Sequence, residues 1–237
     1  MANIALILAG GSGTRTRQDI PKQFLTIEDR PVIVYTMQAF QNHADIDEIA
    51  VVCISGWENV LKAYAKQFNI TKLKHVIQGG DTGQESIQNG LFELEKSHLP
   101  ESIVLIHDSN RPLVSDKIIS DCISTTKKYG CATPVEPCFD AMIETQDGVT
   151  STSHYPKNNI KHAQTPNGFF LGKICELYRR AIAAGVKDSS GPSILMIDMG
   201  EKIHLYSGSA KCFKITTVED IELFKALLNA KKTVWLK

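Results

Sequence analysis

The opening of the chain places the strongest constraint on its fold. An unbroken apolar run from Ile4 to Leu8 has the length and composition of a buried strand. The residues directly after it share small or absent side chains: Ala9, Gly10, Gly11, Ser12 and Gly13. A strand that ends in such a loop can bring backbone N–H groups against phosphate oxygens, because no bulky Cβ holds the ligand away. The opening therefore predicts a first strand and a phosphate-binding loop.

Two cationic side chains follow this loop, Arg15 and Lys22. They could neutralise a polyphosphate and the charge that builds when it is attacked. A tight turn with two solvated basic residues is the alternative. The strand, the glycine loop, Arg15, Pro21 and Lys22 fall within one short span, and this conjunction favours a nucleotide site. The pattern is neither the phosphate loop that ends in Gly-Lys-Ser/Thr nor the dinucleotide G-x-G-x-x-G.

Strand-like and helix-like segments alternate along the rest of the chain. Strands are expected at 48–53, 74–77, 102–107 and 131–135, and helices at 31–43, 57–68, 86–96 and 115–129. This order predicts an α/β fold with a mostly parallel twisted sheet and helices on both faces, as a single domain over residues 1–237. In such sheets ligands bind beyond the carboxyl ends of the strands. The loops at Gly10, Gly79 and Asp108 are expected to meet there.

The pattern changes between residues 137 and 161. This stretch is polar, and Asp147-Gly148 marks a hairpin turn between two β-compatible segments. An ordinary exposed hairpin is one interpretation. A long hairpin with little apolar content is hard to stabilise alone, which favours a protruding β-arm that packs on a partner subunit. After it come a helix at 170–185, strand-like stretches at 202–207 and 211–215, and a last helix at 218–229 that Thr216 or Thr217 caps.

The composition excludes several classes of protein. Lys and Arg together number 26, as do Asp and Glu, so a formal net charge of zero argues against a protein that coats nucleic acid. The six cysteines are scattered without the spacing of a zinc site, as expected for buried thiols in a reducing compartment. The opening lacks the basic region and long apolar core typical of a signal peptide, and no apolar run approaches membrane-spanning length, so neither a signal peptide nor a membrane span is expected. The expected setting is the cytoplasm, with no membrane association.

Three further motifs offer polar groups for chemistry. In QGGDTGQESIQNGL, Gly79 and Gly80 would let backbone approach a flat base, and Asp81 and Ser86 supply hydrogen-bonding groups, although a plain turn with Ser86 as the helix cap also fits. In HDSNRP, Asp108 could bind Mg²⁺ or pair with Arg111. In FKITTVEDIE, Lys214 is a phosphate ligand or a surface lysine at the end of a strand.

Taken in order, five segments resemble one family. LAGGSGTR with PKQFL, GGD with NGL, HDSNRPLV, AQTPNGF and KITTVEDIE are similar to the 2-C-methyl-D-erythritol 4-phosphate cytidylyltransferases, a family that also includes ribitol-5-phosphate cytidylyltransferases of surface-polymer synthesis. The resemblance runs from Asn3 to Leu228. It implies a Rossmann-like nucleotidyltransferase fold, a homodimer built through the β-arm, and Mg²⁺-dependent transfer of CMP from CTP to a polyol phosphate.

The resemblance also implies roles for individual residues. The triphosphate cradle corresponds to Ala9, Gly10, Gly11 and Gly13, and the cytosine and ribose contacts correspond to Gly80, Asp81 and Ser86. Catalytic contacts to phosphate correspond to Arg15, Lys22 and Lys214, and the Mg²⁺ ligand corresponds to Asp108. The acceptor-binding positions correspond to Arg111, Asp140 and Lys157.

The departures from the family pattern fall mainly on positions that read the acceptor. Gly83 stands where the family usually has Arg, Ala141 replaces a Thr of the arm, and Lys157 replaces the arm arginine that grips the acceptor phosphate. The segment KDSSGPS carries an apparent small insertion. Since a lost hydrogen bond to a substrate hydroxyl can change discrimination strongly, the expected acceptor is ribitol phosphate or a related alditol phosphate, with methylerythritol phosphate as the alternative.

Two other classes of function fit parts of the sequence. A non-catalytic nucleotide-binding relative is favoured by Gly83, Ala141 and Lys157, but retention of Arg15, Lys22, Asp108 and Lys214 opposes it. A sugar-nucleotide pyrophosphorylase would also open with a glycine-rich loop and a basic pair, whereas the PKQF and GGD segments indicate cytidine.

Overall fold

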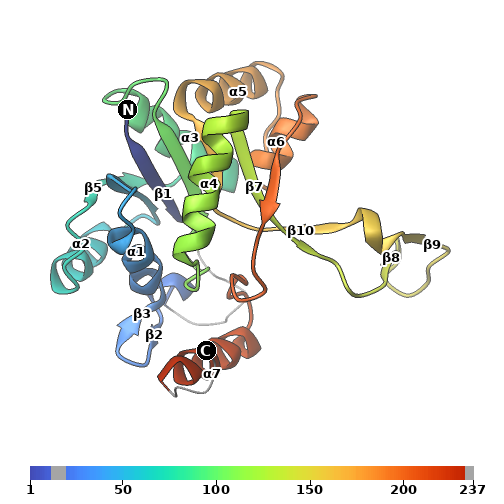
Figure 1. The fold of residues 1–237 in the computed structure, drawn as a ribbon, viewed down its shortest axis with the longest axis horizontal. Helices are drawn as coiled ribbons and strands as arrows, with labels where there is room; N and C mark the ends of the chain where they lie inside the picture. Colours follow the sequence, from blue (N-terminus) through green and yellow to red (C-terminus); the bar gives the residue numbers. More distant parts are fainter. Residues whose placement is uncertain (12–19, 233–237) are drawn as a thin grey trace.

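The computed structural model describes residues 1–11 and 20–232. Its centre is an eight-stranded sheet in the order β10-β7-β11-β6-β1-β4-β5, with β12 paired to β7 (Figure 1). The strands are β1 (Asn3–Ala9), β4 (Glu48–Cys53), β5 (Leu73–Gln78), β6 (Ile103–Asp108), β7 (Cys131–Pro137), β10 (Lys161–Ala163), β11 (Asn167–Phe170) and β12 (Leu205–Ser207). Strands β5, β4, β1 and β6 are parallel neighbours, which confirms the mostly parallel sheet.

Helices cover both faces of this sheet, as predicted. One layer contains α1 (Val32–Asn42), α2 (Glu58–Gln67) and α4 (Asp116–Tyr129), and the other contains α3 (Gly83–Glu95), α5 (Leu171–Ala183) and α6 (Pro192–Asp198). Alternate residues of the central strands serve the two layers: Ala5 and Ile7 of β1 pack in the first core, and Ile4 and Leu6 in the second. Both faces are buried, which explains why β1 reads as a continuous apolar run.

The last helix and a short hairpin form a third apolar cluster. Helix α7 (Val218–Lys232) contributes the buried Phe224, which meets Ile27 of β2 (Thr26–Ile27) and Val32. Strand β3 (Arg30–Pro31) pairs with β2, and the 3-10 helix η2 (Lys22–Phe24) precedes them. The amide of Asp220 donates to Thr217 Oγ1, so Thr217 caps α7 as expected.

Several predictions about single elements were wrong. Strand β11 was not predicted: residues 167–170 form an antiparallel strand between β6 and β7, and the helix expected from 170 begins at Leu171. Helix α6 was also missed; it has only seven residues and begins at Pro192. The stretch 211–215 is not a strand; the Ile215 amide donates to the carbonyl of Asn110, and this contact holds an irregular segment.

The predicted hairpin is present and projects from the body (Figure 1). Strands β8 (Met142–Glu144) and β9 (Ser153–Tyr155) pair across the turn at Asp147-Gly148, where Gly148 has a φ of 73° and the Asp147 carboxylate accepts hydrogen bonds from the amides of Val149 and Thr150. The 3-10 helix η3 (Lys157–Asn159) follows β9. Residues 139–159 are all exposed in the single chain. Across the described residues, no helix combines the length and apolarity needed to cross a membrane.

Candidate active site

A cavity of about 610 Å³ lies where the carboxyl ends of β1, β5 and β6 meet. The loop after β1 contributes Gly10 and Gly11 to its wall, and η2 contributes Lys22. The turn between β5 and α3 contributes Gly80, Asp81 and Ser86. Asp108, at the end of β6, and Lys214 complete the predicted residues that line it. The topology therefore brings together motifs that lie far apart in the sequence.

Two predicted residues of the opening, Gly13 and Arg15, lie outside the described residues. Ala9 is buried at the end of β1 and does not line the cavity; its backbone carbonyl accepts a hydrogen bond that holds the loop. The residue that holds this loop is Gln23, which the motif analysis did not single out. Its Nε2 donates to the carbonyls of Ala9 at 2.8 Å and Gly11 at 3.0 Å, and the side chain is buried. Gln23 thereby fixes the loop beside Lys22.

The turn before α3 packs closely on the glycine loop. A Cβ on Gly10 would lie 3.0 Å from Ser86 Oγ, a tight contact, and a Cβ on Gly80 would lie 2.4 Å from Glu85 Cβ, which leaves no room for a side chain there. Ser86 Oγ accepts a hydrogen bond of 3.1 Å from the Gly80 amide. The alternative in which Ser86 caps the helix does not hold: Thr82 is the N-cap, in a capping box with Glu85, which leaves Ser86 inside α3 at the cavity.

Asp108 lies between two cations. Arg111 Nε donates to Oδ2 at 2.9 Å, and Lys214 Nζ donates to Oδ1 at 3.1 Å. Burial opposes ionisation, but Lys214 and Arg111 outweigh it and lower the Asp108 pKa to about 2. The carboxylate is therefore ionised at neutral pH. The predicted ion pair with Arg111 is present, and Lys214 is no isolated surface lysine because it shares the same partner.

Side chains behind this trio hold it in position. Asn110 Nδ2 donates to the Ile215 carbonyl at 2.5 Å and so fixes the segment that carries Lys214. His107 is buried, with Nε2 3.1 Å from the Arg111 carbonyl and Nδ1 3.0 Å from Thr165 Oγ1. Burial lowers the pKa of His107 to about 4, so the ring is neutral. Sequence reasoning missed the roles of Asn110 and Thr165, although both lie in motifs of the resemblance.

A second hollow of about 260 Å³ adjoins the first. It shares Gly83, Asp108 and Lys214 with the larger cavity, and Arg111 and the segment 189–194 line its other side. In the part of the chain that the structure describes, nothing lies within 4 Å of the Cβ position at Gly83. The segment KDSSGPS, which carries the apparent insertion, thus contributes to the wall of this hollow together with the ion-paired Arg111.

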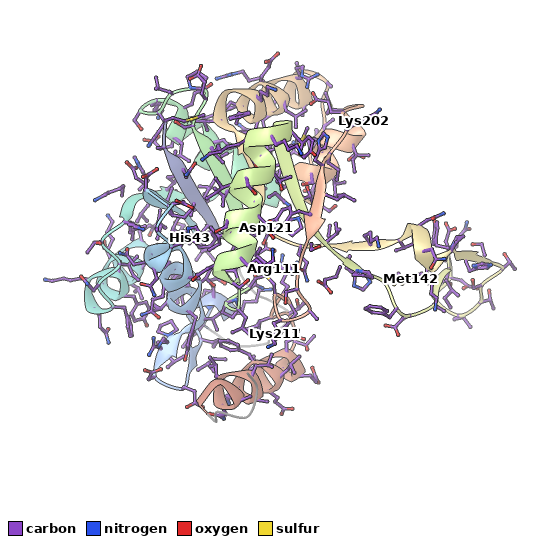
Figure 2. The ribbon with its side chains drawn as sticks, viewed as in Figure 1. His43, Arg111, Asp121, Met142, Lys202 and Lys211 are labelled. Atoms are coloured by element: carbon purple, nitrogen blue, oxygen red, sulfur yellow. The ribbon has the colours of Figure 1, made fainter. Side chains whose placement is uncertain are left out.

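The predicted acceptor residues do not all meet in one chain. Arg111 lies in the body, whereas Met142 marks the distant β-arm (Figure 2). Asp140 and Lys157 belong to the exposed arm segment, and neither lines the two hollows. Asp140 and Lys157 therefore lie apart from the other predicted acceptor residue, Arg111, within the single chain.

The residues at the cavity fit a magnesium ion that arrives with phosphates. Each Asp108 oxygen accepts one of the two charged hydrogen bonds, and a carboxylate oxygen has two lone pairs, so lone pairs remain for a metal ion. Hard oxygen ligands suit Mg²⁺, which proteins often bind through one or two carboxylates together with substrate phosphates. Phosphate charge would offset the repulsion between the ion and the cations at positions 111 and 214.

The fold and this site define a class of protein. The site combines a glycine loop after the first parallel strand, a lysine beside that loop and a carboxylate at the end of a neighbouring strand. These features indicate an α/β protein that binds a phosphorylated ligand beyond the carboxyl ends of its strands.

Comparison with known proteins specifies the family. The family model described as 2-C-methyl-D-erythritol 4-phosphate cytidylyltransferase matches residues 3–230. A ribitol-5-phosphate cytidylyltransferase of Lacticaseibacillus paracasei is 35% identical over 96% of this chain and 98% of that protein. A 2-C-methyl-D-erythritol 4-phosphate cytidylyltransferase of Clostridium novyi is 34% identical over 98% of each. The solved 2-C-methyl-D-erythritol 4-phosphate cytidylyltransferase of Thermus thermophilus superposes with a TM-score of 0.79 at 29% identity, covering 97% of this chain and 100% of that one.

The chain therefore belongs to the 2-C-methyl-D-erythritol 4-phosphate cytidylyltransferase family, and it has the Rossmann-like nucleotidyltransferase fold of that family. The resemblance drawn from its motifs is confirmed.

Proposed function

We propose that this protein transfers CMP from CTP to the phosphate of an alditol, with ribitol 5-phosphate as the first candidate, and releases pyrophosphate. The observation that carries the proposal is the cavity in which Gly10, Lys22, Asp108 and Lys214 converge on the fold of this family. Relatives named ribitol-5-phosphate cytidylyltransferase at 35% and 36% identity support the choice of acceptor. So do Gly83, Ala141 and Lys157, which depart from the expected pattern at acceptor positions.

The proposed reaction is an in-line displacement at phosphorus. An oxygen of the acceptor phosphate forms a bond to the α-phosphorus of CTP as the bond from that phosphorus to the bridging oxygen of the β-phosphate breaks. Pyrophosphate leaves with the bonding electrons, and no covalent enzyme intermediate is needed. Catalysis then consists of positioning and charge stabilisation. Lys22 and Lys214 supply positive charge at the phosphates, and Arg15 is proposed to act with Lys22.

The nucleotide is proposed to lie along the wall formed by the glycine loop and the turn before α3. The amides of the glycine loop, including Gly13, face the triphosphate, and Gly80, Asp81 and Ser86 contact cytosine and ribose. Asp108 is proposed as the ligand of Mg²⁺, which would draw charge from the triphosphate when bound. Support comes from Gly11, where none of the described residues lies within 4 Å of the position that a Cβ would take, and from the ionised carboxylate of Asp108.

We further propose a homodimer in which the arm of one subunit reaches the acceptor site of the other. The segment 137–161 exposes apolar side chains that a lone chain has no reason to present: Phe139 is 79% exposed, Ile143 67% and Val149 87%. Lys157 and Asp140 would then approach the hollow lined by Arg111 in the partner. This arrangement supports a single domain in each chain, with the arm as its dimerisation element.

The acceptor is tested by a panel of sugar-alcohol phosphates. Pyrophosphate release would be measured with CTP, Mg²⁺ and ribitol 5-phosphate, glycerol 3-phosphate or methylerythritol phosphate. Ribitol 5-phosphate should give the highest kcat/KM. Lys22→Ala should reduce kcat at least about 100-fold, the effect of removing one preorganised charge donor.

Methylerythritol phosphate is the second candidate, because the Clostridium novyi relative of that name is 34% identical over 98% of this chain. If methylerythritol phosphate gives a higher kcat/KM than ribitol 5-phosphate, methylerythritol phosphate is the acceptor. Binding of CTP without turnover of any acceptor would instead favour a nucleotide-binding protein without catalytic activity.

A further inference from the structure

Two histidines and a glutamate meet at the end of the sheet opposite the nucleotide cavity. Glu48 is the first residue of β4, His75 lies in β5, and His98 follows the end of α3. The cavity described above lies instead at the carboxyl ends of the parallel strands. Among the residues that the structure describes, these three form the group of His, Cys, Asp or Glu side chains close enough to share one metal ion.

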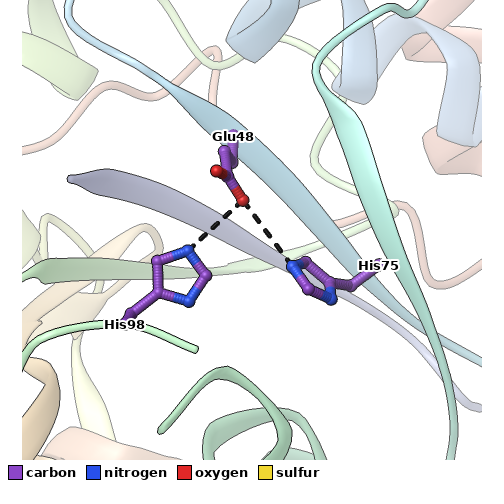
Figure 3. A group of neighbouring side chains, drawn as sticks. All are labelled: Glu48, His75 and His98. Atoms are coloured by element: carbon purple, nitrogen blue, oxygen red, sulfur yellow. Dashed lines mark hydrogen bonds and ion pairs between the residues drawn. The ribbon is translucent and has the colours of Figure 1, made fainter. Parts of the chain in front are cut away.

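The three ligand atoms face one another. Glu48 Oε2 lies 3.3 Å from His98 Nε2 and 3.6 Å from His75 Nε2, and all three atoms lie within 4.8 Å of each other (Figure 3). Figure 3 shows the carboxylate between the two rings, with the same oxygen directed at both. Zinc bound at ~2.0–2.1 Å to tetrahedral ligands separates those ligands by ~3.4 Å. The two distances to Glu48 match this spacing.

An irregularity in the sheet places His75 in the group. The register of β4 and β5 shifts between the pairs Ile49–Leu73 and Ala50–His75, so Lys74 is the extra residue of a bulge. His75 thereby shares a face with Ala50 and Glu48, whereas a regular register would put Lys74 there. The same face is covered by α3, from whose end His98 extends. A bulge that redirects one side chain is frequent beside functional sites.

The ring of His98 has hydrogen-bonding neighbours on both sides. Nδ1 lies 3.0 Å from the Leu94 carbonyl, which can only accept, and 3.0 Å from Ser97 Oγ, which can donate or accept. The tautomer in which Nδ1 donates to the Leu94 carbonyl leaves a lone pair on Nε2, which lies 3.3 Å from Glu48 Oε2. A metal ion between Nε2 and Oε2 suits this tautomer, because both lone pairs then face a cation.

We propose that Glu48 Oε2, His75 Nε2 and His98 Nε2 bind a zinc ion, with water as the fourth ligand. The contact from His98 Nδ1 to a backbone carbonyl is the usual support of a metal-ligating histidine. The exposed fractions of the side chains, 30% for Glu48, 26% for His75 and 9% for His98, leave a path for the ion and the water. Bound zinc would connect β4, β5 and the end of α3.

Metal titration tests this proposal directly. The full-length protein, stripped with a chelator, would be titrated with Zn²⁺ by calorimetry and with Co²⁺ by visible absorption, which reports the coordination geometry. One equivalent of Zn²⁺ should bind with a Kd in the micromolar range or below. His98→Gln and His75→Gln should each raise that Kd at least tenfold, whereas His154→Gln, an exposed histidine of the arm, should leave it unchanged.

The thermal midpoint of each metal-free variant would establish that it folds. If His98→Gln does not fold, His75→Gln still tests the site, because the His75 side chain is more exposed to solvent. Equal Zn²⁺ affinity in the wild-type protein and both cluster variants would overturn the proposal. The absence of a bound equivalent at millimolar Zn²⁺ would overturn it too, and would leave the contact between Glu48 and His98 as a hydrogen bond within the protein.

Discussion

Gln23 acts on the glycine loop from a buried position in η2. Its amide nitrogen donates to the carbonyls of Ala9 and Gly11, so the conformation of the loop depends on this side chain. Lys22, one residue earlier, lines the cavity. A single short helix therefore sets both the backbone of the loop and the position of a cation beside it.

Replacing Gln23 should separate loop geometry from charge. Gln23→Ala leaves two buried or partly buried carbonyls without their donor and should lower the free energy of unfolding by about 2 kcal/mol. The Kd for CTP should rise at the same time. Gln23→Glu keeps the shape but cannot donate, and it should be at least as harmful as Gln23→Ala. Denaturant unfolding and CTP calorimetry measure both effects; a full-affinity Gln23→Glu protein would contradict this role.

Sequence reasoning located charged residues better than their supports. Asp108, Arg111 and Lys214 stand in conspicuous motifs, and the structure joins them in one ion-paired group. Gln23 and Asn110 were missed because an amide in a motif carries no sign of its burial or of its backbone partners. The alternative of Ser86 as the helix cap does not hold, because Thr82, four residues earlier, offers the same hydroxyl chemistry and forms a capping box with Glu85.

At the scale of elements, the pattern of apolar residues correctly predicted the strands that are buried on both faces. Strands β1, β4 and β6 were predicted from their apolar runs and differ from prediction by at most a residue or two. Strand β11 (Asn167–Phe170) was not predicted, because it is short and pairs with β6 and β7, which lie far from it in the sequence. The stretch 211–215 looks like a strand but has no ladder partner in the described structure; contacts with Asn110 hold it instead.

Helix α3 carries two glycines with opposite expected responses to alanine. A Cβ at Gly90 would lie 2.8 Å from methyl groups of Leu6 and Val52, both fully buried in the sheet. Gly90→Ala should therefore lower the free energy of unfolding by about 1–3 kcal/mol. At Gly83 no atom of residues 1–11 or 20–232 lies within 4 Å of the same position, so Gly83→Ala should be neutral or stabilise by up to about 1 kcal/mol. Equal denaturation midpoints for the two variants would contradict this packing.

At the scale of the whole molecule, the sequence predicted the arm from its composition and its turn. The hairpin at β8 and β9 is confirmed, and its apolar side chains are exposed in the single chain. Which surface the arm meets could not be predicted from the chain alone, since partner contacts leave no periodic pattern in a segment of so few apolar residues. The proposed dimer accounts for both the exposure and the distance of Lys157 from the cavity.

The dimer is tested on the arm. Ile143→Asp would occur twice in a two-fold assembly, and losing burial of about 2 kcal/mol at each copy should raise the dimer Kd about 1000-fold. Analytical ultracentrifugation measures this, with Leu99→Asp as the control on an exposed apolar residue outside the arm. Lys157→Ala should raise the KM of the acceptor more than that of CTP. A wild-type protein that sediments as a monomer at high concentration would refute the arm as a dimerisation element.

The most direct test of the central claim is identification of the products formed from CTP and ribitol 5-phosphate in the presence of Mg²⁺. Transfer of CMP predicts CDP-ribitol and pyrophosphate in equal amounts by mass spectrometry and phosphate analysis, with both lost in Lys22→Ala. Pyrophosphate accompanied by free CMP, or no consumption of CTP with any alditol phosphate, would contradict the account.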